Sequence, residues 1–554
     1  MNARQPDGSI RFGTSGFRGR WGIEFTEAVA RDITQAICDY LVEEEELAGK
    51  IVVIGYDSRE HADVVARWCA DVVLQNGFAV HLTSRDTPTP ALAYYAGDVL
   101  KDEAAGVINC TSSHNPVEWQ GIKYSLRDGS ISPPRVTDFI SARATEYRRG
   151  ERSRNPGKLA HADRARLAPF DPRESYCRWL LESGKGDCRI ALNHERMRDY
   201  FTGKPVIVDE MHGTGRGYLR YVLDAIGIPY SIIHGERDPR LGGLPAANPE
   251  EPHIQMLKDT VRQADATIGV GLDTDADRYG IVDRGGAYVT PNAVLAMLTR
   301  YLGVERGLHG RVATTNVTTH ILEHIAADIA GNEAHRPAAG ARPTHLCDPE
   351  YEVVCGDSDE MVTHNVFTVL TGLKHIIQVS QMDSWYRILD PPPHDWRCRL
   401  LIGGEEASGL TTKGHVPDKD GIWAGLLVMD MVAHYRKPLE EIWRDLTSAY
   451  HPSYSMPVNL SIGTTHKGTL IGALLDEASS SGGIAGLEVV YAGRIRFDYA
   501  EFRFRSPDGS IDNFLHVRPS GTEPLVRVYL ETASQAALDA LRADVNARAQ
   551  QPDS

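Results

Sequence analysis

The sequence predicts a multidomain α/β protein that ends in a smaller α+β domain. Up to about residue 435, short apolar runs typical of buried strands alternate with stretches of helical periodicity, and this alternation recurs in three rounds. The C-terminal part instead combines short strands with one terminal helix. A length of 554 residues also exceeds what one domain usually holds, so we expect roughly three to five domains.

The first round contains two helices and three strands. Thr26 is a suitable N-cap for the first helix, whose apolar residues recur at every fourth position, and Gly49 ends it. The strands are expected at residues 51–55, 78–82 and 104–109, and the second helix at residues 62–75. Strands that alternate with helices imply right-handed crossovers and a mostly parallel sheet.

The later rounds repeat this pattern. Second-round strands are expected at residues 205–209, 230–233 and 266–272. The third round has expected strands at 311–317 and 399–403, a helix at 321–329 and an amphipathic helix at 422–435. The C-terminal elements are expected at 487–491, 513–517, 525–530 and, as a helix, 534–549. Residues 150–172 suit a linker, and residues 330–366 and 383–398 look like insertions.

Composition and charge exclude several classes of protein. The formal net charge of −16 argues against a general nucleic-acid binder, which needs a basic face. The eight cysteines form no CxxC pair and suit a reducing cytosol, so we expect a cytoplasmic protein. The sequence shows neither the apolar core of a signal peptide nor the roughly 20 apolar residues of a membrane helix. Nucleic acids and membranes are therefore not expected as partners.

Four polar motifs each follow an expected strand, at the place where ligands bind in open α/β sheets. The first is CTSSHNP at residues 110–116, where Ser113 would need an activating environment to be a nucleophile or phosphoryl carrier. Arg18 and Lys123 are candidates for that environment. Taken alone, this motif is equally well interpreted as a serine-rich turn with an Asx-type hydrogen bond.

The second motif is GLDTDADRYG at residues 271–280. Its three alternating aspartates, Asp273, Asp275 and Asp277, can direct oxygens at one hard cation, and Mg²⁺ prefers a few carboxylates with phosphate oxygens and waters. Arg278 offers a fork for a phosphate or a sugar hydroxyl. A calcium-binding EF-hand is excluded because arginine stands where that loop requires glycine and glutamate. The remaining alternative is a solvated acidic turn.

The third and fourth motifs supply further polar groups. In IGGEEASGL, Glu405 and Glu406 could accept hydrogen bonds from vicinal hydroxyls, although a glycine-rich surface turn is the common alternative. HVRPSGTEPLVRV concentrates a charged fork, hydroxyls and backbone N–H groups that suit a phosphate dianion, unless it is a simple hairpin turn. These groups belong to Arg518, Ser520, Gly521 and Thr522. Together the four motifs indicate phosphoryl transfer on a phosphosugar, where catalysis is mostly positioning and charge neutralisation.

The sequence resembles the α-D-phosphohexomutase superfamily in five signature segments, in the order typical of that superfamily. The segments are FGTSGFRG, TSSHNP, DTDADR, GGEEASG and RPSGTEP, with smaller matches in GYDSR, NPEEPH, TGLK and GHVPDKDGI. The resemblance covers residues 11–531. Within the superfamily, the sequence is most similar in character to the phosphoglucomutases and phosphomannomutases of the bacterial type.

This resemblance implies four domains around a central cleft: three related α/β domains with mixed sheets and a smaller C-terminal α+β domain. The expected domains are residues 1–170 (domain I, phosphoserine loop), 171–290 (domain II, metal-binding loop), 291–435 (domain III, sugar-binding loop and insertions) and 436–554 (domain IV, phosphate-binding loop).

The resemblance also implies a mutase reaction on hexose phosphates. Ser113 would carry a phosphate, and one Mg²⁺ per active site would be bound by Asp273, Asp275, Asp277 and a phosphoserine oxygen. The carrier phosphate would pass to a sugar hydroxyl and give a hexose 1,6-bisphosphate, which serves as intermediate and activator. After this intermediate reorients, its other phosphate would return to Ser113.

Individual residues take their expected roles from the same resemblance. Arg18, His114 and Lys123 match positions that line the phosphoserine, and Lys123 is the candidate general acid or base. The expected substrate contacts are Arg278, Lys374, Glu405, Ser408, Arg518, Ser520, Gly521 and Thr522.

The expected substrates are phosphates of glucose, mannose or both. Ala407 stands where a serine that touches sugar hydroxyls is common, and Ser408 follows it, so this loop bears on sugar discrimination. The alternatives are a phosphoglucosamine or phosphopentose mutase, a hydrolase that transfers the phosphate to water, and a non-catalytic phosphosugar-binding paralogue. The expected assembly is a monomer or a homodimer.

Overall fold

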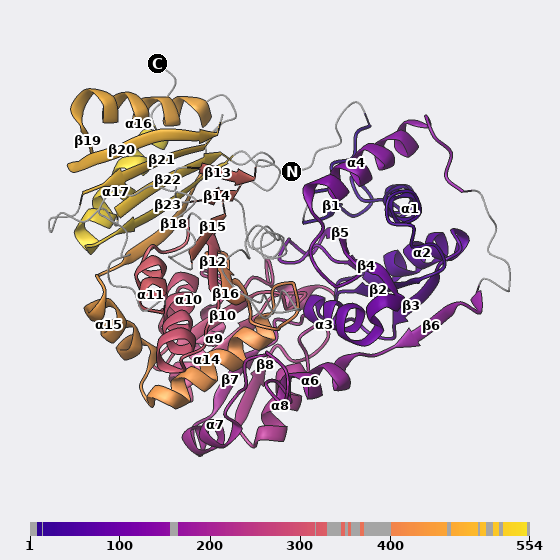
Figure 1. Cartoon of the computed structure of the whole chain (residues 1–554), viewed down its shortest axis with the longest axis horizontal. Helices are drawn as coiled ribbons and strands as arrows, with labels where there is room; N and C mark the ends of the chain where they lie inside the picture. Colours follow the sequence, from indigo (N-terminus) through magenta and orange to yellow (C-terminus); the bar gives the residue numbers. More distant parts are fainter. Residues whose placement is uncertain are drawn as a thin grey trace.

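The computed structural model of the chain contains three α/β domains and a C-terminal α+β domain, each on its own sheet (Figure 1). The expected fold class is therefore confirmed. The described residues are 8–13, 15–155, 164–315, 317–329, 345–348, 353–355, 366–369, 400–461, 467–496, 499–505, 513–519 and 525–550. Four expected site residues and most of the expected insertions lie outside the described residues: Lys374, Ser520, Gly521, Thr522, most of 330–366 and all of 383–398.

Domain I is a six-stranded mixed sheet in the order β1-β5-β4-β2-β3-β6. Its elements are β1 (Phe17–Arg20), α1 (Glu27–Glu43), β2 (Ile51–Tyr56), α2 (Ala62–Gln75), β3 (Ala79–Thr83), α3 (Thr89–Tyr94), β4 (Ala104–Cys110), β5 (Trp119–Ser125), α4 (Pro134–Arg149) and β6 (Leu167–Phe170). Alternate residues of β2 face opposite layers. Val52 and Ile54 pack with α1, α2 and α4, whereas Val53 packs with Leu92 of α3.

The sheet of domain I is mostly parallel, as expected, but its pairing is antiparallel at one edge. Strands β4, β2, β3 and β6 run parallel, whereas β5 pairs antiparallel with both β4 and β1. The eight residues 111–118 between β4 and β5 are too few for a parallel crossover, which needs about a dozen or more. The first motif therefore lies in a hairpin connection.

Two further expectations in domain I need adjustment. Thr26 is the N-cap of α1, and its hydroxyl accepts a hydrogen bond from the backbone N–H of Val29, but the helix ends at Glu43 and not near Gly49. Within the expected linker 150–172, β6 pairs in parallel with β3 and extends the sheet.

Domain II is a five-stranded sheet in the order β11-β10-β9-β7-β8. Its elements are α6 (Arg173–Leu181), α7 (His194–Phe201), β7 (Val206–Asp209), α8 (Tyr218–Ile226), β8 (Tyr230–Ile233), α9 (Gln255–Gln263), β9 (Ile268–Leu272), β10 (Tyr279–Asp283) and β11 (Tyr288–Val289). Strands β8, β7 and β9 are parallel, and β10 and β11 form an antiparallel edge. The aspartate motif occupies the short connection between β9 and β10, as the serine motif occupies the one between β4 and β5.

Domain III repeats this arrangement in a sheet of the order β13-β14-β15-β12-β16-β17. Its elements are α10 (Pro291–Arg300), β12 (Arg311–Thr315), α11 (Ile321–Ile329), β13 (His345–Asp348), β14 (Val353–Cys355), β15 (Val366–Val369), β16 (Leu400–Glu405), β17 (Gly409–Thr412), α14 (Gly421–Tyr435) and α15 (Leu439–Ala449). The antiparallel pair β16 and β17 is joined by residues 406–408, so the third motif also lies in a hairpin turn.

Helix α14 is not amphipathic, contrary to expectation, because every residue from Gly421 to Ala433 is buried. The helix contacts β9 and β10 of domain II on one side and β17 and α10 of domain III on the other. A helix that is buried on every face is typical of such a central position, and its acidic residue, Asp430, is paired with Arg196 of α7. Leu439, Ile442 and Leu446 of α15 belong to the same core, so the expected boundary at 435/436 falls between two helices that share it.

Domain IV is an antiparallel sheet in the order β18-β23-β22-β21-β20-β19. Its elements are β18 (Tyr454–Ser461), α16 (Lys467–Ser481), β19 (Gly483–Ile484), β20 (Leu487–Arg496), β21 (Tyr499–Phe504), β22 (Asn513–Pro519), β23 (Leu525–Thr532) and α17 (Gln535–Ala549). Both helices contribute to one core cluster on the sheet. On β22 and β23, Phe514 and Tyr529 instead pack with Val317 of domain III.

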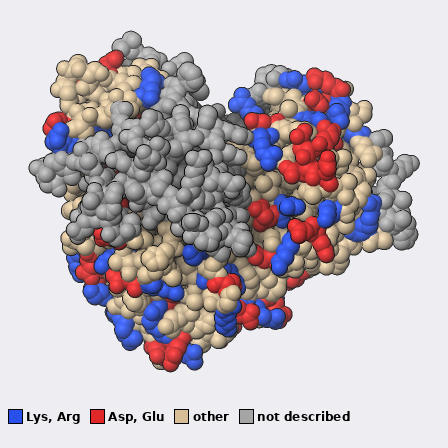
Figure 2. All heavy atoms as spheres, in the orientation of Figure 1, with Lys and Arg blue, Asp and Glu red and all other residues tan. Residues whose placement is uncertain are grey.

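The described helices and one face of the surface have two further features. Within the described part of the chain, no helix combines the length and the apolar character needed to cross a membrane. On the face of domain I shown in Figure 2, basic and acidic side chains are interspersed.

Candidate active site

The four domains meet around a cavity of about 210 Å³. Its charged lining comprises six basic and four acidic side chains, although the whole chain carries a net charge of −16. These are Arg18 and Lys123 of domain I, Asp277 and Arg278 of domain II, Glu405, Glu406, Asp418 and Lys419 of domain III, and Arg518 and Arg527 of domain IV. This excess of cations suits an anionic ligand.

Ser113 lies in the β4–β5 connection, next to the aspartate loop that contributes Asp277 to this cavity. Its side chain is 1% exposed, and its hydroxyl donates a hydrogen bond to Asp273 Oδ2 at 3.1 Å. The hydroxyl also lies 3.3 Å from Nδ1 of His114. The structure thus brings the serine motif of domain I against the aspartate motif of domain II.

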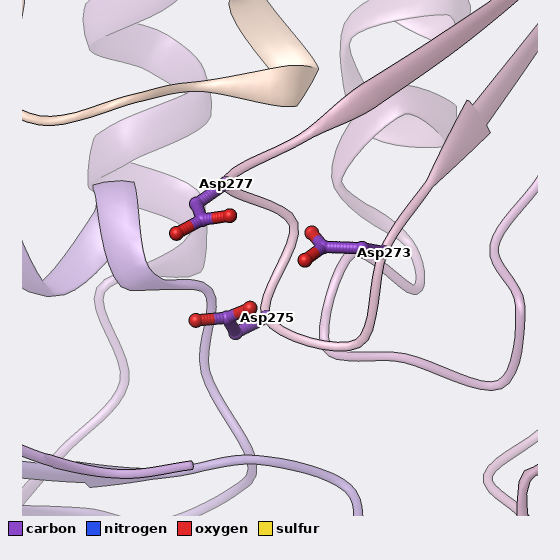
Figure 3. Close-up of side chains that lie close together, drawn as sticks. All are labelled: Asp273, Asp275 and Asp277. Atoms are coloured by element: carbon purple, nitrogen blue, oxygen red, sulfur yellow. The ribbon is translucent and has the colours of Figure 1, made fainter. Parts of the chain in front are cut away.

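The three aspartates of the β9–β10 connection converge on one point (Figure 3). One carboxylate oxygen from each of Asp273, Asp275 and Asp277 lies within 4.8 Å of the others, and all three side chains are buried. Oδ1 of Asp275 and Oδ1 of Asp277 are buried without a hydrogen-bond partner. Buried oxygens that lack a donor and face one another are the arrangement in which a hard cation is held, so this group could hold a metal ion.

Two lysines and a threonine partly satisfy these carboxylates. Nζ of Lys123 donates to Asp275 Oδ2 at 2.6 Å and to Asp277 Oδ2 at 3.1 Å, and Nζ of Lys419 lies 3.1 Å from the same Asp277 oxygen. Thr89 at the start of α3 donates its hydroxyl to Asp275 Oδ2 at 2.7 Å. The aspartate loop of domain II is therefore bound by groups from domains I and III.

The three carboxylates differ in their affinity for protons. Burial, together with the neighbouring Asp277 and Asp275, raises the pKa of Asp273 well above its ordinary value. Burial acts in the same direction on Asp275 and Asp277. Lys123 and the Thr89 hydroxyl together outweigh burial and the neighbouring Asp277 at Asp275, and Lys123, Lys419 and Arg278 together outweigh burial at Asp277, so the pKa of each is lowered.

The basic groups around Ser113 are held by short contacts. Nη1 of Arg18 on β1 donates to the side-chain oxygen of Asn115 at 2.7 Å. Arg18 lies opposite Gly121 of β5, where a Cβ atom would come within 2.3 Å of the Thr111 carbonyl oxygen, so this close approach of strands requires glycine. Arg278 and burial, together with Arg18, lower the pKa of His114 well below its ordinary value, which keeps this imidazole neutral.

The third motif reaches the cavity with Glu405, Glu406 and Ala407. Thr315 donates its hydroxyl to Glu406 Oε2 at 2.8 Å, and burial next to Glu405 raises the pKa of Glu406. Ser408 is not among the lining residues, in contrast to its expected role. It adopts a φ of +62°, is fully buried, and donates its hydroxyl to Glu250 Oε1 at 2.6 Å.

The fourth motif contributes Arg518 at the end of β22. Its cross-strand partner on β23 is Arg527, and the two arginines line the cavity together with Tyr529. Two adjacent guanidinium groups on neighbouring strands repel one another unless an anion lies between them. This side of the cavity is therefore suited to a phosphate.

Several residues of the site were not singled out from the sequence. Lys419 lies within the GHVPDKDGI segment and Arg527 within HVRPSGTEPLVRV, but neither motif by itself indicates a role for its cation. Thr89 carries no sequence signal, because its contact with Asp275 arises only when domains I and II come together.

Four models of one protein family match the chain. The model of the phosphoglucomutase/phosphomannomutase alpha/beta/alpha domain I matches residues 9–151, that of domain II residues 189–286, that of domain III residues 362–450 and that of the C-terminal domain residues 478–548. Together these segments cover more than two thirds of the chain. The chain belongs to the phosphoglucomutase/phosphomannomutase family of mutases, within the α-D-phosphohexomutase superfamily.

Relatives that match nearly the whole chain are named for different sugars. A phosphoglucomutase from Komagataeibacter xylinus is 25% identical, over 96% of this chain and 90% of its own length. A probable phosphoglucosamine mutase from Thermococcus gammatolerans is 25% identical, over 95% of this chain and 94% of its own. The solved structure of a putative phosphomannomutase from Thermus thermophilus has the same fold, with a TM-score of 0.71, 24% identity and coverage of 97% and 98%.

Asp418 is a buried acid in the lining whose protonation we expect to affect stability. Burial raises the pKa of Asp418 to about 7, although Lys419 opposes the shift. The backbone N–H of Lys419 donates a hydrogen bond to Asp418 Oδ1 at 2.7 Å, and the amide oxygen of an asparagine at position 418 can accept the same bond. The pKa of Asp418 is thus higher in the folded than in the unfolded protein, so binding a proton at this carboxyl stabilises the folded state. This stabilisation is complete below the unfolded pKa of about 4 and is lost as the pH rises through about 7.

We therefore predict that Asp418→Asn stabilises the metal-free protein, and does so more at pH 8 than at pH 5. The free energy of unfolding should rise by about 2–4 kcal/mol at pH 8 and by about 2 kcal/mol less at pH 5, since asparagine mimics the protonated acid. Chemical denaturation in EDTA at both pH values measures this, with the exposed Asp138→Asn as control. An equal effect at both pH values would contradict the prediction.

Proposed function

We propose that this protein is a phosphohexomutase that interconverts hexose 1-phosphates and hexose 6-phosphates of glucose, mannose or both. The observation that carries the proposal is that Ser113 is hydrogen-bonded to the aspartate cluster, and that one member of this cluster, Asp277, lines the same cavity as the paired arginines of domain IV. Ser113 carries the phosphate, gives it to a sugar hydroxyl to form a hexose 1,6-bisphosphate, and receives the other phosphate after the intermediate reorients. Positioning and charge neutralisation supply most of the catalysis in such a transfer.

We assign one Mg²⁺ to the aspartate cluster of each active site. The orphaned oxygens of Asp275 and Asp277, the proximity of Asp273 and the all-oxygen donor set fit this ion, with a phosphoserine oxygen of Ser113 as a further ligand. Bound there, Mg²⁺ neutralises charge on the transferring phosphoryl group.

Lys123 serves as general acid in this proposal, and Arg18 and His114 bind the phosphate on Ser113. Burial alone would lower the pKa of Lys123, but Asp275 and Asp277 outweigh it and raise the pKa, so the ammonium group retains its proton. A protonated lysine can donate a proton to the departing serine oxygen, which suits the acid role better than that of a base.

The sugar and the non-reacting phosphate are bound on the opposite side. Arg278, Glu405 and Glu406 line the cavity, and we assign them to the sugar hydroxyls. Arg518 and Arg527 hold the phosphate that does not react, with Ser520, Gly521 and Thr522 of the same segment, and Lys374 completes the substrate contacts. A site that recognises only the phosphate accepts the sugar in both orientations, as a mutase requires.

The sugar is the open part of this proposal, since relatives of similar identity are named for glucose, glucosamine and mannose. Incubation with a panel of sugar 1-phosphates, Mg²⁺ and catalytic hexose 1,6-bisphosphate tests it. Turnover of glucose or mannose phosphates supports the proposal. If only glucosamine or pentose phosphates were turned over, the proposed glucose and mannose substrates would be wrong. Release of inorganic phosphate would indicate a hydrolase.

The first prediction of this proposed function concerns the phosphoryl carrier. Intact-mass analysis of the purified protein should show a fraction heavier by one phosphate, located on Ser113 by peptide mapping. Ser113→Ala should remove this fraction and lower mutase activity by several orders of magnitude, because no acceptor remains. The adjacent buried serine provides a matched control: Ser112→Ala loses a bond to the Trp119 carbonyl and should cost at most about tenfold. Near-normal activity in Ser113→Ala would refute the mechanism.

The second prediction concerns the metal. Mutase activity should disappear in excess EDTA and return with Mg²⁺. Asp275→Asn should weaken Mg²⁺ binding by at least about tenfold in calorimetry, since it removes one carboxylate while its amide oxygen can still accept the Thr89 hydroxyl. Asp138→Asn is the exposed control. Full activity in EDTA would show that no divalent ion is needed.

The third prediction concerns the distal phosphate. Arg518→Ala should lower kcat/KM by about 10- to 150-fold, which corresponds to the loss of a charge-assisted hydrogen bond of about 1.5–3 kcal/mol. Both reaction directions should suffer by the same factor, because the enzyme cannot change the overall equilibrium. Arg505→Ala, which removes a surface ion pair with Glu488 in the same domain, is the control. An unchanged kcat/KM in Arg518→Ala would exclude this segment from the site.

A further inference from the structure

Arg59 is a fully buried charged residue whose side chain contacts Asp57 and the two loops that carry Ser113 and the aspartates. It belongs to the GYDSR segment that ends β2, and its side chain is 0% exposed. Its ion-pair partner is Asp57 at 3.2 Å, whose side chain is equally buried. A guanidinium group removed from water needs acceptors for its donors, so the groups around it show what it holds in place.

The guanidinium group of Arg59 binds the backbone of the serine loop at three points. Nη1 donates to the Pro116 carbonyl at 2.6 Å, and Nη2 donates to the carbonyls of Asn115, at 2.5 Å, and of Ser113. Nη2 also lies 3.5 Å from the Thr274 hydroxyl oxygen in the aspartate loop. One planar side chain thereby links the serine loop of domain I with the aspartate loop of domain II.

Asp57 fixes the same loop from its other side. Its Oδ2 accepts the Thr111 hydroxyl at 2.7 Å, and the Thr111 oxygen accepts the backbone N–H of Ser113 at 2.8 Å. The ion pair therefore fixes the carbonyl of Ser113 directly and its N–H through Thr111. Ser113 has a φ of +53°, a left-handed conformation that a serine keeps only where its surroundings determine it.

We propose that Arg59 is a positioning residue for phosphoryl transfer. By binding three loop carbonyls, it holds Ser113 in the left-handed conformation from which the serine hydroxyl meets Asp273. This inference rests on the proposed role of Ser113 as phosphoryl carrier. Arg59 acts through Ser113 and not on the sugar. A transfer reaction is sensitive to such positioning, since a misplacement of about 1 Å can cost about 100-fold in rate.

The test is Arg59→Lys, which keeps the charge but cannot reproduce the planar fork that reaches three carbonyls. We expect kcat and the rate of Ser113 phosphorylation by glucose 1,6-bisphosphate to fall about 100-fold. The KM for the hexose phosphate should change by less than about threefold, because the substrate contacts lie elsewhere. Arg143→Lys is the matched control, since Arg143 pairs with Asp39 and Glu43 in the same domain, and it should leave both rates unchanged.

Hydrogen exchange provides a readout that needs no turnover. In Arg59→Lys, backbone amides of residues 111–117 should exchange faster than in the wild type, while those of α1 keep their protection. Unchanged exchange in this loop, or wild-type transfer rates in the folded variant, would overturn the inference. A wild-type protein without phosphate on Ser113 would instead refute the proposed function, and the exchange measurement would still test the positioning.

A second variant covers the case in which Arg59→Lys does not fold. Asp57→Asn keeps an acceptor for the Thr111 hydroxyl but removes the charge that anchors Arg59. We expect the rate of Ser113 phosphorylation to fall as in Arg59→Lys, and the amides of residues 111–117 to exchange faster in the same way. Wild-type values of both would exclude a positioning role for the ion pair.

Discussion

The burial of three carboxylates on one short loop is the constraint on which the rest of the structure depends. Asp273, Asp275 and Asp277 have lost their hydration and repel one another, so the loop is stable only if protons or cations lie close to it. The structure supplies Lys123 from β5 and Lys419 from the segment before α14. The relative placement of domains I, II and III is therefore coupled to the charge balance of a single loop.

Much of the fold and the centre of the site could be predicted because they depend on local patterns. Buried parallel strands are short apolar runs, and the runs at 51–55, 205–209 and 266–272 correspond to β2, β7 and β9. The serine and aspartate motifs follow two of these strands, and the carboxyl ends of strands are where ligand sites form. Ser113 and Asp273 consequently lie together as expected, with 3.1 Å between their oxygens.

What could not be predicted depends on contacts between distant segments. Helix α14 is buried on all sides because two domains enclose it, whereas its periodicity alone indicates one buried face. Ser408 lies one position beyond Ala407, and the tight turn between β16 and β17 directs its hydroxyl to Glu250 and not to the cavity. The contacts of Thr89 and Lys419 with the aspartates likewise exist only after the domains assemble.

The hairpin placement of the polar motifs has an entropic consequence. The serine, aspartate and glutamate loops are each held at both ends by paired antiparallel strands, so most of their conformational freedom is lost when the chain folds. A ligand that meets loops already ordered need not spend its binding free energy on ordering them. More of that free energy then remains for discriminating between the ground state and the transition state, which is the difference on which catalysis depends.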